Sequence, residues 1–385
     1  MAKQQYEYGS VSIFAVVFAS LLMTIITVSF IKLMVIDQQR AAVNDLSQSA
    51  YDAALAGVED AKRVVRACQQ NPGSAACAAL ASGDCDTIAK SGVIPAQGLG
   101  DYRETMIQSA IGGATVGKEF DQAYTCVRVD MNTPDYVYTA REGVSHIVSL
   151  RSASDFARVR VEWFTRQDND GREVLPPMHT DGLPELGADR WGAQTPPLLR
   201  AQLITPGASY KVQDLDATTA SYTAFISPAY VTTTASSAPM IIEPSERRQP
   251  SSPHHVTCTR AFSYSDGVYA CQVELRAPSG SVSAAASHNA LLRLMPVYRG
   301  ATVRVTLMNQ EGATVPFYGV QPRVDATGRA NNVFRRVAAR LQIGESGLYP
   351  ESALEADGDV CKNFVVAGDE VVVERPNGIA CEPWK

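Results

Sequence analysis

The most constraining feature of this 385-residue chain is an apolar run close to its N-terminus. Residues 10–31 contain no charged residue and no proline, and they have the length and apolarity that a membrane-spanning helix needs. A secretory signal peptide would have a shorter apolar core, of about 7–15 residues, followed by small residues before its cleavage site. The longer run in this chain has no clear site of that kind, so we expect it to be retained.

The spacing of apolar residues changes after Lys32. They then recur at intervals of three and four, which places them on one face of a helix. These residues are Val43, Leu46, Ala50, Ala54, Val58, Ala61, Val65 and Cys68. No proline precedes Pro72, and Gly57 is the only glycine between Ser10 and that proline. We therefore expect one helix, about 87 Å long, with a membrane half at residues 10–36 and an amphipathic half at 37–68.

Gly9 and Ser10 lie where a short polar leader, residues 1–9, meets the apolar run. This junction resembles the N-termini of type IV pilins and of type II secretion pseudopilins, which prepilin peptidase cleaves after the glycine. Residues 47–63 resemble the alanine-rich helix of PilX-type minor pilins. The resemblance covers residues 9–66 and implies cleavage between Gly9 and Ser10.

One position departs from the pilin pattern. Most pilins carry a glutamate at the fifth residue of the mature chain, where it neutralises the N-terminal ammonium of a neighbouring subunit in the apolar filament core. Counted from Ser10, that position is Phe14. PilX-type proteins and the large pseudopilin of the filament tip often lack this carboxylate as well. The resemblance therefore implies a minor subunit, at the tip or in the shaft, with an uncleaved membrane anchor as the alternative.

The resemblance also assigns helix residues to filament packing, because small side chains let neighbouring helices approach. The expected packing residues are Phe14, Ala15, Ala19, Val43, Leu46, Ala50, Ala54, Val58 and Val65. The implied partners are other pilin subunits, the inner-membrane pilus assembly machinery and prepilin peptidase. The implied location is the cytoplasmic membrane, crossed once with the head outside, and then a cell-surface pilus.

Eight cysteines follow the apolar run: Cys68, Cys77, Cys85, Cys126, Cys258, Cys271, Cys361 and Cys381. An even number outside the membrane segment indicates up to four disulfides in an oxidising compartment. Zinc is the competing explanation, but the chain has no C-x-x-C pair and its five histidines show no ligand spacing beside the cysteines. We expect disulfides, and neither a metal nor another cofactor.

Two local cysteine pairs stand out. Cys258 and Cys271 flank a Ser-Asp-Gly turn signal between aromatic-rich strands, so a disulfide between them would staple a hairpin. Cys361 and Cys381 would close a C-terminal loop, a placement that resembles the C-terminal disulfide loop of many pilins. Of the cysteines around the helix end, which are Cys68, Cys77 and Cys85, we expect one to reach Cys126.

The sequence beyond the helix predicts a β-rich head. Residues 69–100 are rich in small residues and predict an irregular connection. Strand-like alternation over residues 101–166 predicts an antiparallel sheet on the amphipathic half of the helix, so that residues 69–170 form a pilin-like β head. Residues 171–200 contain five prolines and predict a connection.

Short strand patterns resume at residue 201, with the spacing of an all-β sandwich or sheet. We expect residues 201–385 to form either a second lobe or a large insertion, and a turn at Thr327-Gly328. Residues 320–343 also resemble the closing strands of PilX-type heads. The predicted fold class is α+β, with a long helix, transmembrane and then amphipathic, on a disulfide-stabilised head of antiparallel strands.

Composition and motifs limit the functional classes. A net charge of −6 gives no basic surplus for a polyanion, so we predict no specific nucleic-acid partner. The motifs of the nucleophile elbow, the zinc helix and the phosphate-binding loops are missing from the sequence. Calcium loops starting at Asp168 or Asp357 would lack the glutamate at the twelfth position.

These observations favour a structural and interaction protein that is not an enzyme. As a minor pilin or pilin-like subunit, it would present its head for priming, tip or adhesion contacts, although the sequence does not reveal the ligand of that head. The alternatives are an adhesin-like binding protein, anchored in the membrane outside any filament, and a surface enzyme.

Overall fold

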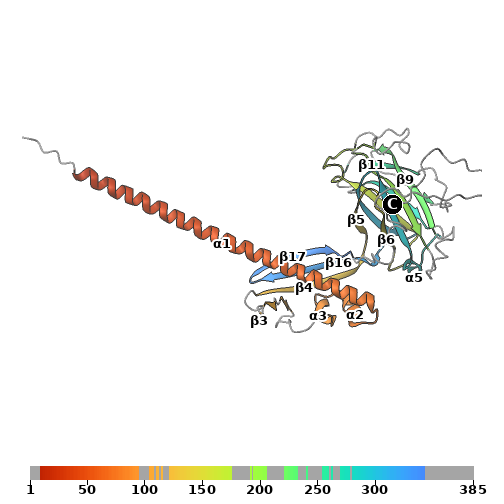
Figure 1. The fold of residues 1–385 in the computed structure, drawn as a ribbon, viewed down its shortest axis with the longest axis horizontal. Helices are drawn as coiled ribbons and strands as arrows, with labels where there is room; N and C mark the ends of the chain where they lie inside the picture. The colour runs from red at the N-terminus through yellow and green to blue at the C-terminus, as the bar shows by residue number, and fades with distance from the viewer. Residues whose placement is uncertain are drawn as a thin grey trace, which may run out of the picture. The chain divides into compact units, whose positions relative to one another are not determined.

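The computed structural model describes residues 9–94, 104–107, 110–111, 114–115, 121–175, 191–192, 194–205, 221–232, 240–241, 254–259, 262, 269–277 and 280–342. Its first element is helix α1 (Gly9–Gln70), whose 62 residues run without a break (Figure 1). At 1.5 Å per residue this helix is about 93 Å long. The predicted helix over residues 10–68 is therefore confirmed to within two residues at each end.

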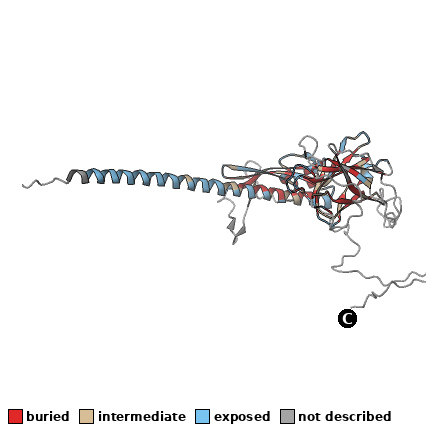
Figure 2. Ribbon diagram, turned by 90° about the horizontal axis from the view of Figure 1, so that it is seen from above, coloured by how far each residue is buried: buried red, intermediate tan, exposed pale blue. Residues whose placement is uncertain are grey.

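The two halves of α1 differ in what covers them. None of the residues 13–49 is buried, whereas the face of the helix that follows is covered by the head (Figure 2). The buried positions recur at helical spacing, and most of them are small: Ala50, Ala53, Ala54, Gly57, Val58, Ala61, Val64 and Val65. The interruption-free sequence therefore gives one helix, and only its C-terminal part belongs to the core of the head.

A four-stranded antiparallel sheet covers that part of α1. Its strands are β1 (Thr105–Met106), β4 (Gln122–Thr133), β16 (Phe317–Ala330) and β17 (Val333–Arg340), in the order β1-β4-β16-β17. The helix contacts β4, β16 and β17. Val127, Val324 and Ala326 of the sheet share a buried cluster with Val58, Ala61 and Val65 of α1. We call these strands the helix-bound sheet.

The connection after α1 is more regular than expected. It contains α2 (Ala75–Ser82) and α3 (Thr87–Lys90), where the sequence had predicted irregular structure. Alanine is the best helix former, and the alanine-rich segment makes one short helix that ends at Gly83, a glycine with φ of 63°. Leu80 and Ile88 join the cluster beneath α1, so both short helices belong to its core.

Most remaining strands form an eleven-stranded sheet, which we call the inserted sheet. The path β15-β14-β7-β12-β11-β9-β8-β13-β6 carries two side strands, β5 beside β14 and β10 beside β12. The strands are β5 (Tyr136–Ala140), β6 (His146–Ser149), β7 (Arg158–Thr165), β8 (Leu198–Ile204), β9 (Ser221–Thr232), β10 (Met240–Ile241), β11 (His254–Thr259), β12 (Tyr269–Arg276), β13 (Leu291–Val297), β14 (Ala301–Met308) and β15 (Thr314–Val315). A separate two-stranded sheet joins β2 (Ala110–Ile111) to β3 (Ala114–Thr115), and a short helix, α5 (Ala284–Ser287), precedes β13.

The inserted sheet has its own core. Trp163 of β7, Leu203 of β8, Leu292 of β13 and Val305 of β14 belong to one buried cluster, although β7 and β8 are not neighbours in the sheet. Two strand pairs, β9 with β11 and β10 with β12, are parallel, which the sequence did not predict. All other pairs are antiparallel, in agreement with the expected head.

Strand pairing crosses the domain boundary that the sequence suggested. Both sheets combine strands from residues 69–170 with strands from residues 201–385, and β8 begins inside the expected connection. The chain leaves the helix-bound sheet at Thr133 and returns to it at Phe317, and these two residues are Cα partners in neighbouring strands. Residues 134–316 are thus an insertion between two paired strands, whereas the sequence predicts a second lobe or a large insertion at residues 201–385.

The predicted turn at Thr327-Gly328 is wrong. Strand β16 continues through both residues, with a shift of its register against β4 between them, and the chain reverses at Asn331 and Asn332 instead. Asn331 has φ of 52°, a left-handed conformation that asparagine tolerates better than most residues. The glycine at 328 serves the packing of α1, because its missing side chain lets the helix backbone approach the strand.

Candidate functional site

The N-terminal half of α1 is the largest uncovered apolar surface in the described part of the chain. Phe14 is 77% exposed and Phe18 68% exposed, and the apolar residues that follow them up to Val35 are similarly open. The helix is long and apolar enough to cross a membrane. Residues 10–31 measure about 33 Å along the axis, close to the thickness of the bilayer's hydrocarbon core.

The hydroxyl groups of the serines and threonines in residues 13–31 are satisfied by the helix itself. Ser20 donates to the carbonyl of Val17 and Thr24 to that of Leu21, each at 2.8 Å. Ser29 donates to the carbonyl of Ile25 at 2.8 Å. An unpaired hydroxyl in hydrocarbon is costly. Because these hydroxyls are paired within the helix, the surface is compatible with contact to lipid or to another apolar helix.

The expected packing residues fall into two groups. Phe14, Ala15, Ala19 and Val43 are exposed and Leu46 is half-buried, so they remain available to another molecule. The other four are buried under the chain's own head and face no solvent: Ala50, Ala54, Val58 and Val65. The chain's own helix-bound sheet covers these four residues, and their assignment to contacts between subunits stays a prediction. The processing residues Gly9 and Ser10 begin α1, so cleavage between them would leave a helix that starts at the new N-terminus.

Polar contacts fix the head to α1. The Tyr124 hydroxyl on β4 donates to the Asp60 carboxylate on α1 at 2.7 Å. Burial, together with the neighbouring Asp60, holds the pKa of Tyr124 well above its usual value, so the hydroxyl keeps its proton and remains a donor. On β17, Nε of Arg335 donates to the Ser47 hydroxyl at 2.7 Å, one turn before the buried stripe begins. The sheet therefore holds the helix by buried packing and by hydrogen bonds at Ser47 and Asp60.

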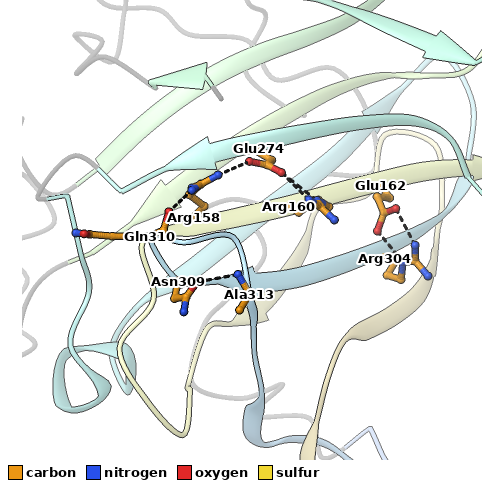
Figure 3. A network of polar contacts seen from close by, with 8 residues as sticks. All are labelled: Arg158, Arg160, Glu162, Glu274, Arg304, Asn309, Gln310 and Ala313. Carbon is orange, nitrogen blue, oxygen red and sulfur yellow. Dashed lines mark hydrogen bonds and ion pairs between the residues drawn. The ribbon is translucent and has the colours of Figure 1, made fainter. Parts of the chain in front are cut away.

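A charged network crosses three neighbouring strands of the inserted sheet, β12, β7 and β14 (Figure 3). The Arg304 guanidinium on β14 binds the Glu162 carboxylate on β7 through two hydrogen bonds of 2.7 Å. Glu274 on β12 accepts from Arg160 at 2.7 Å and from Arg158 at 3.1 Å. Because these residues lie opposite or diagonal to one another in the ladder, their pairing fixes the register of β12, β7 and β14.

The protonation states of the network follow from these contacts. Burial by itself raises the pKa of Glu274, but the hydrogen bonds from Arg160 and Arg158 outweigh it and lower the pKa below its ordinary value. Arg304 also lies over the Tyr269 ring, 4.6 Å from its centroid. Arg158 and Arg160 thus hold the buried Glu274 carboxylate in its ionised form.

Three disulfides join described cysteines: Cys68–Cys77, Cys85–Cys126 and Cys258–Cys271. The Cys258–Cys271 pair links β11 to β12 at directly opposite positions, as the sequence predicted. Of the three cysteines around the helix end, Cys85 is the one that reaches Cys126. Cys361 and Cys381 lie outside the described residues. The bonds at Cys68 and Cys85 tie the end of α1 to α2, and the segment before α3 to β4.

The acidic turn at Asp168 is occupied by the chain's own groups. Its carboxylate accepts hydrogen bonds from the backbone N–H of Thr165 at 2.7 Å and of Thr302 at 3.0 Å, and from both threonine hydroxyls. No group of three or more histidine, cysteine, aspartate or glutamate side chains comes together in the described ranges. The turn at residues 166–171 therefore links β7 to the start of β14.

Sequence reasoning missed the charged network and the interaction of Gly328 with α1. The network had a visible signal, because Arg158, Arg160 and Glu162 alternate with apolar residues along one predicted strand. Its partners on β12 and β14 lie more than a hundred residues away, and the pairing of those strands cannot be read from the local pattern.

The fold defines a protein with one helix able to span a membrane and a β-rich, disulfide-bonded head of α+β class. Comparison with protein-family models, curated proteins and solved structures gives no match to this chain.

Proposed function

We propose that the chain is a minor pilin or pilin-like subunit of a type IV pilus or a related filament. It assembles through the uncovered half of α1 and presents its β-rich head for priming, tip or adhesion contacts. Its partners are other pilin subunits, the inner-membrane assembly machinery and prepilin peptidase. The role is structural and involves no catalysis.

A single observation carries this proposal: one continuous helix has an exposed apolar half and a half that is buried in the head. Residues 13–35 are exposed in the described chain. One face of residues 50–65 packs in the core of the head. A membrane anchor needs only the first part, joined to its domain by any linker. A subunit that moves from lipid into a filament needs a rigid connection between the two, because the helix then exchanges lipid contacts for contacts with neighbouring helices.

Phe14 supports a minor rather than a major subunit. It lies in the exposed part of α1, at the position where most pilins carry the carboxylate that pairs with a neighbouring amine. An apolar side chain cannot neutralise that amine, so a shaft built from this chain alone would bury an unpaired charge in every repeat. The same residue keeps open the alternative of an uncleaved, adhesin-like anchor outside any filament.

The test is the mass of the mature protein. The full chain is expressed with and without prepilin peptidase, extracted from membranes and from sheared filaments, and measured by intact mass and N-terminal sequencing. We expect a chain that starts at Ser10 when the peptidase is present, and an uncleaved chain in a Gly9→Val variant. Gly73→Ala is the matched control, since Gly73 lies in an open turn.

Retention of residues 1–9 in the presence of an active peptidase would contradict the filament proposal and favour the anchored binding protein. Absence of the processed chain from sheared filaments would separate a pilin-like membrane protein from a true filament subunit.

A further inference from the structure

A hollow of about 410 Å³ opens where the insertion joins the helix-bound sheet. It is lined by Asn132 at the end of β4, Tyr318 at the start of β16, Ser152, and His288 just after α5. Its volume lies within the range of small-molecule sites. The Tyr318 side chain is 38% exposed and offers an aromatic surface.

The walls of this hollow are held in place by the backbone. The Tyr318 N–H donates to the Arg151 carbonyl at 3.0 Å, and the Ala153 N–H donates to the Pro316 carbonyl at 3.1 Å. The Ser152 N–H donates to the Ser287 hydroxyl at 3.0 Å. The hollow is therefore a preformed feature of the junction.

Arg151 lies next to the Tyr318 wall of this hollow, although it is not one of the residues that line it. Its guanidinium lies over the Tyr318 ring, 5.2 Å from the centroid, and its Nε–H is buried without a hydrogen-bond partner. It makes no ion pair with any residue in the described part of the chain, whereas Arg304 and Arg329 each bind a carboxylate. A half-buried guanidinium without a counter-ion is costly, so the site favours an anion.

The neighbouring groups agree with a positive local potential. Burial and then the charge of Arg151 lower the pKa of His288, and no carboxylate offsets them. The carboxylate that contacts α5, Asp155, accepts from the Ala284 backbone N–H at 2.9 Å. At neutral pH the imidazole is uncharged and the arginine provides the positive charge of the hollow.

We propose that this hollow binds an organic carboxylate carried on a sugar-sized ring. The carboxylate pairs with Arg151, the ring lies along Tyr318, and the Asn132 amide offers a donor and an acceptor for hydroxyl groups. The proposal does not depend on whether the chain enters a filament, because it concerns the head alone.

Binding is measured by calorimetry on the full chain in detergent micelles, with glucuronate, its neutral analogue glucose, and acetate. We expect glucuronate to bind at least ten times more tightly than the other two. Arg151→Gln should weaken glucuronate at least tenfold, and Arg151→Lys, which keeps the charge, should retain most of the affinity. Phe334→Ala is the matched control, because it removes an exposed aromatic ring on β17.

A second readout separates binding from misfolding. A bound anion stabilises the protonated imidazole, so glucuronate should raise the pKa of His288, followed by NMR of its ring protons, in the wild type but not in Arg151→Gln. By linkage, glucuronate affinity should also increase as the pH falls through the titration of His288.

Three results would overturn the proposal. They are no saturable binding of glucuronate up to about 10 mM, equal binding of glucose or acetate, and full affinity in a folded Arg151→Gln variant.

Discussion

Gly328 on β16 lies directly against the backbone of Ala50 on α1. A Cβ atom placed on Gly328 would be 2.1 Å from the Ala50 carbonyl oxygen and 2.3 Å from the Ala54 nitrogen. Gly57 makes the reciprocal approach from the helix side, where a Cβ would be 3.0 Å from the Val127 side chain. At Gly328, helix and sheet are therefore packed at a distance that only glycine permits.

Gly328→Ala should destabilise the head strongly. The added methyl group meets main-chain atoms that cannot rotate away, so the helix and strand must separate, at a cost of about 1–3 kcal/mol or more. The measurement is denaturant unfolding of the full chain in micelles. The control Gly73→Ala should change the free energy of unfolding by no more than about 0.5 kcal/mol. An equal effect in both variants would contradict the close approach of helix and strand.

Glu274 should make the head less stable in acid. Its pKa is lowered in the folded state relative to the ordinary value of 4.5, so folding favours the ionised form. The resulting stabilisation is complete above the ordinary value and is lost as the pH falls through the lower folded-state pKa. Glu274→Gln should cost about 1.5–3 kcal/mol at neutral pH and flatten the decline in acid. Unfolding measured from neutral to strongly acidic pH tests both effects.

The matched control for this pH series is Glu59→Gln, since Glu59 pairs with Lys62 at 3.6 Å on the exposed side of α1. This variant should follow the wild-type profile. If Glu274→Gln retained the full acid dependence, the network would not be its source.

The disulfides should contribute unequally to the stability of the head. Cys85–Cys126 closes a separation of 41 residues and Cys68–Cys77 one of 9. In the chain-entropy account the longer loop restricts the unfolded state more, by a difference of about 1 kcal/mol. Replacing both cysteines of each pair by alanine should therefore lower the melting temperature more for Cys85–Cys126. The opposite order would indicate that local packing around α2 outweighs loop entropy.

Phe14→Glu tests the assignment as a minor subunit. Under the proposed function, the new carboxylate can neutralise the amine of a following subunit, so more copies of the chain should be found in sheared filaments. Phe14→Leu keeps the position apolar and should leave the number unchanged. Quantitative mass spectrometry of filaments provides the count. An unchanged number in Phe14→Glu would mean that Phe14 does not limit incorporation.

Local patterns predicted local structure well. The helix could be located because residues 10–70 contain neither proline nor a second glycine beside Gly57, and the strand at 158–165 because its polar and apolar residues alternate. The Cys258–Cys271 disulfide could be predicted for the same reason, because its two strands are close in sequence. In each case the physical cause acts within a few residues.

Non-local pairing was beyond the sequence. A glycine such as Gly328 ordinarily indicates a turn. Only the position of α1 in the structure shows that Gly328 is needed for close contact between β16 and the helix backbone. The sequence likewise shows that Ala50 and Ala54 lie on the amphipathic face of the helix. It does not show whether a neighbouring subunit or the chain's own sheet covers that face. A helical stripe reveals that a face is covered and leaves the partner undetermined.

The pairing of Thr133 with Phe317 makes the head modular. Since the chain departs and re-enters at adjacent positions of one sheet, the whole of residues 134–316 can be exchanged for a tight loop without changing the path of β4 or β16. Such a chain would keep α1 and the helix-bound sheet and lose the inserted sheet, so the two parts of the head could be exchanged independently.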